Sequence, residues 1–170
     1  GGFDTSNVLT MKNMFISSDK LTSINLKSFD TGKVRTMEGM FSYCVSLISL
    51  DLSNFNTASV ESFHQMFYNI NDLTSLDLSS FRTDSALDMS DMFNFADGLT
   101  YINMDHFNTE KVTTFDNMFN YCTGLTSLNL CSFKADSCTT AYQMFNAARG
   151  LTHLSIQEDT YNKIKNLGQT

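Results

Sequence analysis

Three histidines, four cysteines and several aspartates are the residues of this 170-residue sequence that could act as metal ligands, nucleophiles or proton acceptors. All of them lie within a repeat of 26 residues that recurs six times without insertion or deletion, starting at residues 3, 29, 55, 81, 107 and 133. His64, His106 and His153 occupy different positions of this repeat, so no two of them line up on neighbouring copies. The sequence contains no phosphate-binding loop, H-E-x-x-H, C-x-x-C or nucleophile elbow. We therefore expect no catalytic residues, no cofactor and no metal site, and predict that the protein is not an enzyme.

The four cysteines are expected to be free thiols. Cys44 and Cys122 hold the same position of copies two and five. Three strand spacings of ~4.8 Å would place them about 14 Å apart, well beyond the ~7 Å between Cα atoms that a disulfide allows. Cys138 falls where other copies have Val or Ala, so it is expected in the core, whereas Cys131 falls at an exposed strand position. Cysteine usage therefore leaves the cellular compartment open.

Polar side chains are predicted to form three rows on the outward face of the strands. In each copy an alternation such as Leu47-Ile48-Ser49-Leu50-Asp51-Leu52 indicates a strand whose leucines point inward. The rows are Ser23, Ser49, Ser75, Tyr101, Ser127 and His153; Asn25, Asp51, Asp77, Asn103, Asn129 and Ser155; and Lys27, Ser53, Ser79, Asp105, Cys131 and Gln157. Copies two and three are nearly featureless here, whereas Tyr101, Asp105 and His153 break the pattern.

Tyr101 is the strongest single candidate for contact with a partner. Binding hot spots favour Tyr, Trp and Arg, although a solvent-facing substitution without a role is the simpler alternative. The candidate partner-binding residues on this face are Tyr101, Asn103, Asp105, Asn129, His153, Asp77 and Asp51. A solvated row of aspartates is favoured over a Ca²⁺ site, because Ser and Asn supply too few further oxygen ligands.

Each repeat is predicted to place a short helix behind its strand. Thr31 would cap this helix by accepting a backbone N–H bond, and Val34, Met37, Met40 and Phe41 follow one helical face. Twelve of the 15 Phe and six of the 10 Met fall at three repeat positions, which indicates core rows and a stacked Phe spine. Because helices pack at ~8–10 Å and strands at ~4.8 Å, the strand side would be concave. The predicted fold class is an α/β solenoid of six repeats, with parallel strands on the concave face and short helices on the convex face.

Composition and the chain ends limit the remaining possibilities. The net charge is −7 and the 11 Lys and Arg are scattered, which argues against nucleic-acid binding. No run of about 18 apolar residues exists, so no membrane span is expected. Gly1 and Gly2 occupy positions that follow a strand in other copies, so an upstream part is expected to be missing. Residues 1–158 would form the solenoid, and residues 159–170 a C-terminal cap or flank with a helix that Asp159 caps. As a fragment, the chain is expected to be a monomer.

The strand segment L-x-x-L-x-L-x-x-F, as in Leu73 to Phe81, resembles the leucine-rich repeat signature, with Phe in place of the usual Asn. The whole repeat is similar to the 26-residue bacterial surface-protein repeat of the BspA-like leucine-rich repeat family over residues 3–158. The residues that carry this resemblance in copy two are Phe29-Asp30-Thr31, Val34, Met37, Met40-Phe41, Cys44 and Leu47 through Ser53. The resemblance implies a cell-surface or secreted protein that acts in adhesion to host proteins or to other cells.

Binding is favoured over catalysis, because a stack of repeats presents a long surface rather than a pocket. The first hypothesis is a non-catalytic extracellular binding or adhesion module that recognises a protein or glycan partner on a host or neighbouring cell. The second is a structural spacer or stalk in a larger surface protein. The third is an intracellular protein-binding scaffold, a setting that free thiols would fit.

Replacing Phe81 with Ala is expected to lower the free energy of unfolding by about 3–5 kcal/mol, because a large buried side chain would leave a cavity. Denaturant titration of the two proteins measures this difference. A loss of less than about 1 kcal/mol would mean that Phe81 lies outside the core rows.

Overall fold

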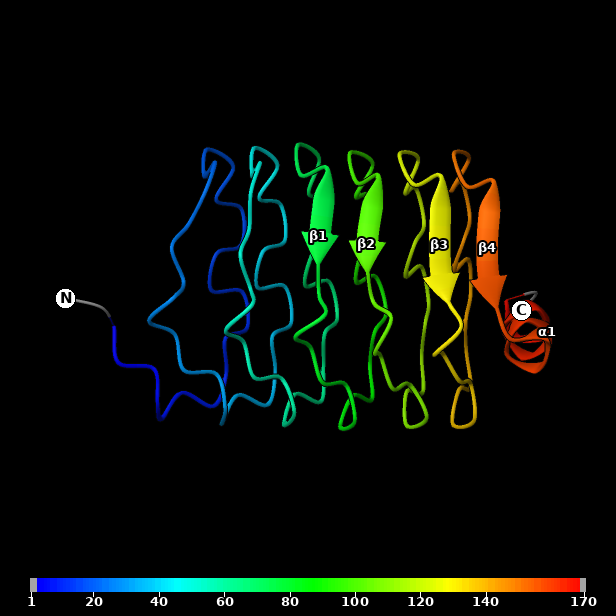
Figure 1. The fold of residues 1–170 in the computed structure, drawn as a ribbon, viewed down its shortest axis with the longest axis horizontal. Helices are drawn as coiled ribbons and strands as arrows, with labels where there is room; N and C mark the ends of the chain where they lie inside the picture. The colour runs from blue at the N-terminus through cyan, green and yellow to red at the C-terminus, as the bar shows by residue number, and fades with distance from the viewer. Residues whose placement is uncertain (1–2, 169–170) are drawn as a thin grey trace.

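The computed structural model describes residues 3–168, in which each repeat forms one coil of the chain. Successive coils lie side by side along the longest axis of the molecule, and the C-terminal helix lies at the far end (Figure 1). The regular elements are β1 (Ser75–Asp77), β2 (Tyr101–Asn103), β3 (Ser127–Leu130), β4 (His153–Ile156) and α1 (Glu158–Leu167). Gly1 and Gly2, for which the sequence suggested a preceding strand, lie outside the described residues.

The strands pair in parallel and in the register of the repeat, as the sequence predicted. β1 pairs with β2 and β3 with β4, so that Ser75 lies opposite Tyr101 and Ser127 opposite His153. The strands predicted for copies one and two are not formed as regular strands, because residues 21–26 and 47–52 are extended without continuous pairing.

The backbones of neighbouring copies approach closely at the corner before β2, β3 and β4. Glycine precedes β2, β3 and β4, as Gly98, Gly124 and Gly150. A Cβ atom on Gly98 would lie 1.7 Å from the carbonyl oxygen of Asn71 in the preceding copy. Copies one, two and three carry Lys20, Ser46 and Asp72 at this corner, so β1 forms without a glycine there.

The helix predicted behind each strand is wrong: this side of the coil is a series of tight turns. In copy two, Gly39 and Tyr43 have φ angles of 61° and 60°, which an α-helix does not contain. Backbone donors alternate in direction here. The N–H of Met40 bonds within its own turn, whereas the N–H of Phe41 bonds to the carbonyl of Met66 in the next copy at 3.0 Å. Apolar residues at this spacing are compatible with a helix and with these turns. Only the turns leave backbone N–H groups free to bond to the next copy.

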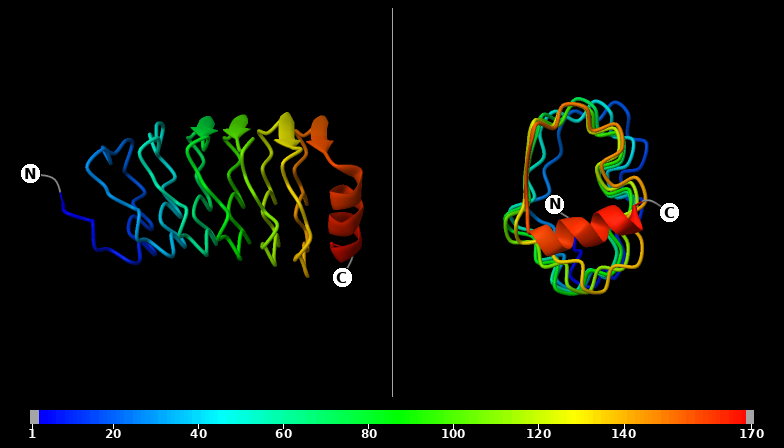
Figure 2. Two further views of the ribbon diagram at one scale, coloured as in Figure 1. Left: turned by 60° about the horizontal axis from the view of Figure 1, so that its bottom comes forward. Right: turned by 90° about the vertical axis from the view of Figure 1, so that its right-hand side faces the viewer.

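A second hydrogen-bonded ladder therefore runs along the turn side of the stack. Parallel bridges connect Thr10, Thr36, Ser62, Asp88, Thr114 and Thr140 in sequence. The turn side is bonded from copy to copy along its length, whereas on the strand side the ~4.8 Å spacing of paired strands holds within the pairs β1–β2 and β3–β4. The coils stack along a nearly straight axis, and the predicted concave strand face does not form (Figure 2).

Buried threonines clamp each copy to the next. Thr31 does not cap a helix: its hydroxyl donates to the carbonyl of Asn56 at 3.0 Å and accepts the N–H of Asn56 at 2.8 Å. The same pair of bonds recurs at Thr5, Thr57, Thr83 and Thr109. Copy six has Ala135 at this position and cannot form the clamp. Within the described residues no further coil follows copy six, because the chain continues into α1.

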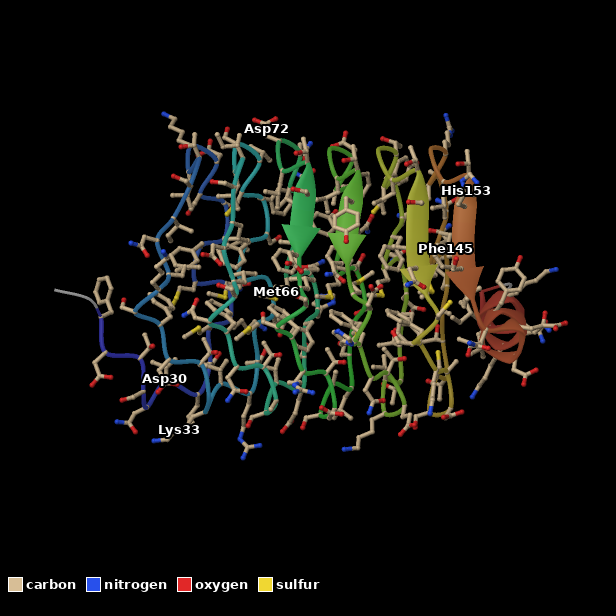
Figure 3. All side chains as sticks on the ribbon, viewed as in Figure 1. Asp30, Lys33, Met66, Asp72, Phe145 and His153 are labelled. Atoms are coloured by element: carbon tan, nitrogen blue, oxygen red, sulfur yellow. The ribbon has the colours of Figure 1, made fainter. Side chains whose placement is uncertain are left out.

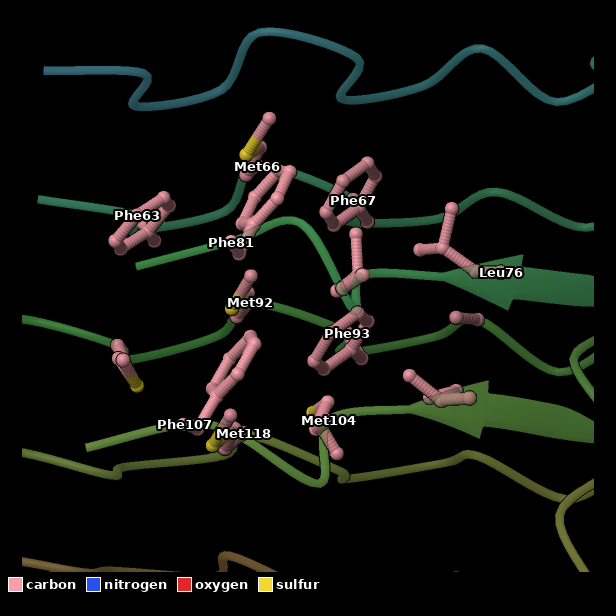
Figure 4. Packing of buried hydrophobic residues seen from close by; sticks show 14 of the residues in the cluster. Phe63, Met66, Phe67, Leu76, Phe81, Met92, Phe93, Met104, Phe107 and Met118 are labelled. Atoms are coloured by element: carbon pink, nitrogen blue, oxygen red, sulfur yellow. The ribbon is translucent and has the colours of Figure 1, made fainter. Parts of the chain in front are cut away.

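Phenylalanine rings stack in two rows through the interior (Figure 4). The rings of Phe67 and Phe93 are 5.6 Å apart and 6° from parallel. Their row runs from Phe15 to Phe145 with centroid separations of 5.5–5.9 Å. Phe81 belongs to the second row and stacks on Phe107 at 6.5 Å. The spine predicted at Phe81 is present, but the continuous row is the one that the Met-Phe pairs supply.

Helix α1 lies across the end of the last coil (Figure 2). Its N-cap residue is Gln157, so Asp159 lies inside the first turn and is not the cap that the sequence predicted. Ile164 is buried in the core, and the hydroxyl of Thr160 donates to the carbonyl of Phe133 at 3.2 Å. The helix thereby covers apolar side chains and a carbonyl of the last coil.

Replacing Thr57 with Val should lower the free energy of unfolding by about 1–3 kcal/mol, because it removes the buried hydroxyl that bonds both the N–H and the carbonyl of Arg82. Thr100→Val is the matched control, since the Thr100 hydroxyl makes one exposed bond, to the carbonyl of Thr74. The control should change the free energy by less than about 0.5 kcal/mol. Equal losses for both variants in urea titrations would contradict the clamp.

Candidate binding surface

A depression of about 350 Å³ lies on the strand face of the last three copies. It is lined by Tyr101, Ile102, Asp105, Ser127, Leu128, Asn129, His153 and Ser155. Tyr101, Asp105, Asn129 and His153 were all among the residues predicted to contact a partner. Figure 3 shows β2, β3 and β4 side by side, with His153 at the start of β4. The structure thus brings side chains from three successive copies to one place.

The depression lies where β2 and β3 are not paired with each other and where a small residue lies between two large ones. Tyr101, Ser127 and His153 occupy the same outward position of β2, β3 and β4. Tyr101 is 55% exposed, and the Nδ1 atom of His153 lies 2.9 Å from the hydroxyl of Thr152. Ile102 and Leu128 beneath are only 7% and 4% exposed. The opening is therefore bounded by two rings and offers mainly polar groups.

Asp105 and Asn129 hold each other in place at the lower side of the depression. The Asn129 side-chain amide donates to Oδ1 of Asp105 at 2.9 Å, and Oδ1 of Asn129 accepts the N–H of Cys131 at 3.1 Å. None of the lining residues is a lysine or arginine, so the carboxylate of Asp105 gives the depression a negative charge. The arrangement can exchange hydrogen bonds with a polar ligand that carries no negative charge.

The other three predicted residues, Asp51, Asp77 and Asn103, do not line this depression; their oxygen atoms fix the turn after the strand. Oδ1 of Asp51 accepts bonds from the hydroxyl and N–H of Ser53, which lower the pKa of Asp51 below its usual value. The backbone N–H of Ser79, and then its hydroxyl, likewise lower the pKa of Asp77. Asx turns of this kind account for the aspartates without any ligand.

A contact between histidine, serine and aspartate on the turn side was missed by the sequence reasoning. Nδ1 of His64 lies 2.7 Å from the hydroxyl of Ser90, which itself donates to Asp88 at 2.6 Å. Asp91 lies 4.0 Å from the same Nδ1 atom. A catalytic triad needs the carboxylate on the imidazole nitrogen opposite the serine, so this is not triad geometry. The sequence could have indicated this contact, because His64 and Ser90 occupy the same position of neighbouring copies.

Four surface aromatic rings form a row that the sequence reasoning also missed. Tyr43, Tyr68, Phe95 and Tyr121 lie on successive copies, with centroid separations of 5.2, 5.7 and 4.7 Å. Tyr43, Phe95 and Tyr121 adopt positive φ angles. Their rings contact one another, whereas among the described residues Tyr101 has no aromatic partner. The row therefore stabilises the stack, whereas the ring of Tyr101 is 55% exposed and lines the depression.

The cysteines are free thiols, as predicted, and only Cys131 is exposed. Burial raises the pKa of Cys122 to about 12, and burial also raises the pKa values of Cys44 and Cys138. These three thiols are core groups. Within residues 3–168 no group of three or more His, Cys, Asp and Glu side chains is arranged to hold a metal ion.

The comparison with protein families identifies the repeat. The family model described as "Mycoplasma protein of unknown function, DUF285" matches residues 1–101 and again residues 69–169. The chain belongs to the DUF285 family. The two overlapping matches agree with the internal repetition of the sequence, so this DUF285 chain is a repeat protein. No curated protein and no solved structure matches it. Across the part of the chain that the structure describes, no helix is long and apolar enough to cross a membrane.

A thiol reagent such as dithionitrobenzoate should modify one cysteine per native chain at pH 8 and all four in guanidinium chloride. The reason is that only the Cys131 thiol reaches solvent, while burial keeps Cys44, Cys122 and Cys138 protonated and inaccessible. Absorbance of the released thiolate counts the modified groups. A Cys131→Ser variant should release none in the native state, and rapid reaction of that variant would contradict the burial of the other three.

Proposed function

We propose that this DUF285 chain is a non-catalytic binding or adhesion module, secreted or held at a cell surface. Its partner would be a protein or glycan on a host or neighbouring cell, bound at the depression between Tyr101 and His153. One observation carries the proposal: Tyr101, Asp105 and His153, which break the repeat pattern on the strand face, all line that depression. Regular positions of the repeat build the stack, so residues that depart from the pattern are free to serve another purpose.

The proposal includes a leucine-rich-repeat solenoid of the BspA-like type. The L-x-x-L-x-L spacing and the parallel strands in the 26-residue register support it. The surface location is supported by that resemblance alone. The tight turns opposite the strands set this repeat apart from leucine-rich repeats that place a helix there.

A spacer or stalk is the alternative that a specific observation favours. Copies two and three carry Ser49 and Ser75 in the first outward row and Ser53 and Ser79 in the third. Such a surface offers no hot-spot side chain. If the last three copies bind nothing either, the stack would serve to hold other parts of a larger surface protein apart.

A triple variant tests the proposal by restoring the pattern of copy three. Tyr101→Ser, Asp105→Ser and His153→Ser together should weaken attachment to cells by about tenfold or more, because a hot-spot side chain contributes at least about 2 kcal/mol. Flow cytometry of the fluorescently labelled chain on epithelial and bacterial cells measures attachment.

The matched control is Tyr142→Ser, which removes an exposed tyrosine from the turn side of the coil. Equal melting temperatures of the variants would establish that the stack is intact. Attachment that survives the triple change, or an unaltered chain that attaches to none of the cells, would favour the spacer instead.

A further inference from the structure

We infer that the depression binds one ring of an uncharged saccharide, inserted between the side chains of Tyr101 and His153. The inference rests on the proposed function and narrows its partner to a glycan. It is carried by three features of the depression: its width, the hydrogen-bonding groups that line it, and its charge.

The width follows from the register of the stack. Tyr101 and His153 are separated by β3 alone. β3 and β4 are paired but β2 and β3 are not, so the Cα atoms of Tyr101 and His153 lie at least roughly 10 Å apart, which is two spacings of paired strands. A ring held between two others needs about 7–8 Å, which is twice the van der Waals contact distance of 3.5–4.0 Å. The serine at position 127 leaves this space open. One six-membered ring therefore fits the opening.

The lining groups match the hydroxyls of a sugar. Asp105 accepts hydrogen bonds, Asn129 can donate and accept, and the exposed hydroxyls of Ser127 and Ser155 do both. A saccharide ring presents hydroxyls around its edge and C–H groups on its faces. The hydroxyls would meet the polar groups while the C–H face lies against the ring of Tyr101. The bond between Asn129 and Asp105 fixes both side chains before a ligand arrives, which limits the entropy lost on binding.

Charge and apolar area argue against two other ligands. An anionic sugar would meet the carboxylate of Asp105, no cationic lining residue and a chain of net charge −7. A peptide needs a pocket that buries an apolar anchor side chain. Ile102 and Leu128 expose only 7% and 4% of their surface, so such an anchor would have little apolar area to cover.

The experiment uses an array of immobilised oligosaccharides that end in glucose, galactose, mannose or N-acetylglucosamine, together with sialylated and sulfated forms. The unaltered chain should bind at least one uncharged sugar, and it should bind no acidic sugar more strongly than that one. Tyr101→Ala should weaken that binding about tenfold, Tyr101→Phe should retain most of it because the ring remains, and Tyr142→Ala should leave it unchanged. Binding only to acidic sugars, or binding that Tyr101→Ala does not alter, would overturn the inference.

A second measurement separates failure of the inference from failure of the proposed function. Cells that bind the chain are treated either with glycosidases or with a protease. Attachment that depends on Tyr101 but persists after glycosidase treatment and disappears after protease treatment would leave the proposed function standing and reject the saccharide. Attachment that is the same for Tyr101→Ala and the unaltered chain would reject both.

Discussion

Hydrogen bonding from each copy to the next is the constraint on which the rest of the structure depends. On the turn side, alternate backbone N–H groups, such as that of Phe41, donate to carbonyls of the next copy. Buried threonine hydroxyls do the same work elsewhere in the coil: that of Thr57 bonds both the N–H and the carbonyl of Arg82 in the next copy. An unpaired buried backbone group costs about 1–3 kcal/mol, so one inserted residue would leave several of these groups unpaired. The constant period of 26 residues is the consequence, and the stacked rings of Phe67 and Phe93 follow from it.

The same constraint decides what kind of binding surface this fold can offer. The coils stack along a nearly straight axis, so the strand face has no curvature with which to enclose a partner. A depression can then arise from a gap between unpaired strands, as between β2 and β3, and from a difference in side-chain size between neighbouring copies. Tyr101, Ser127 and His153 supply that difference, in the order large, small, large. In copies one to three the corresponding position is serine throughout, and the side chains there differ too little to form such a depression.

The sequence predicted the register, the buried Met and Phe rows and the free thiols, because period and alternation determine them. It could not predict the turns. Apolar residues at Val34, Met37 and Phe41 satisfy a helix and a series of turns alike, and the choice rests on bonds to another copy 26 residues away. For the same reason the threonine clamp was taken for a helix cap. The Asx turns at Asp51 and Asp77 were missed because a polar outward residue was assigned to solvent rather than to its own backbone.

The position of the depression beside α1 bears on how well it is preorganised. The last coil of a stack lacks a neighbour on one side, and an uncovered coil would fray. Ile164 and Thr160 of α1 cover part of that side, and β4 is held on its other side by pairing with β3. His153 is carried by β4, and its ring is further held by the Thr152 hydroxyl at 2.9 Å. A side chain fixed in this way loses little freedom when a ligand binds. The helix thus covers the end of the core, while the strand that carries His153 is held by its pairing with β3.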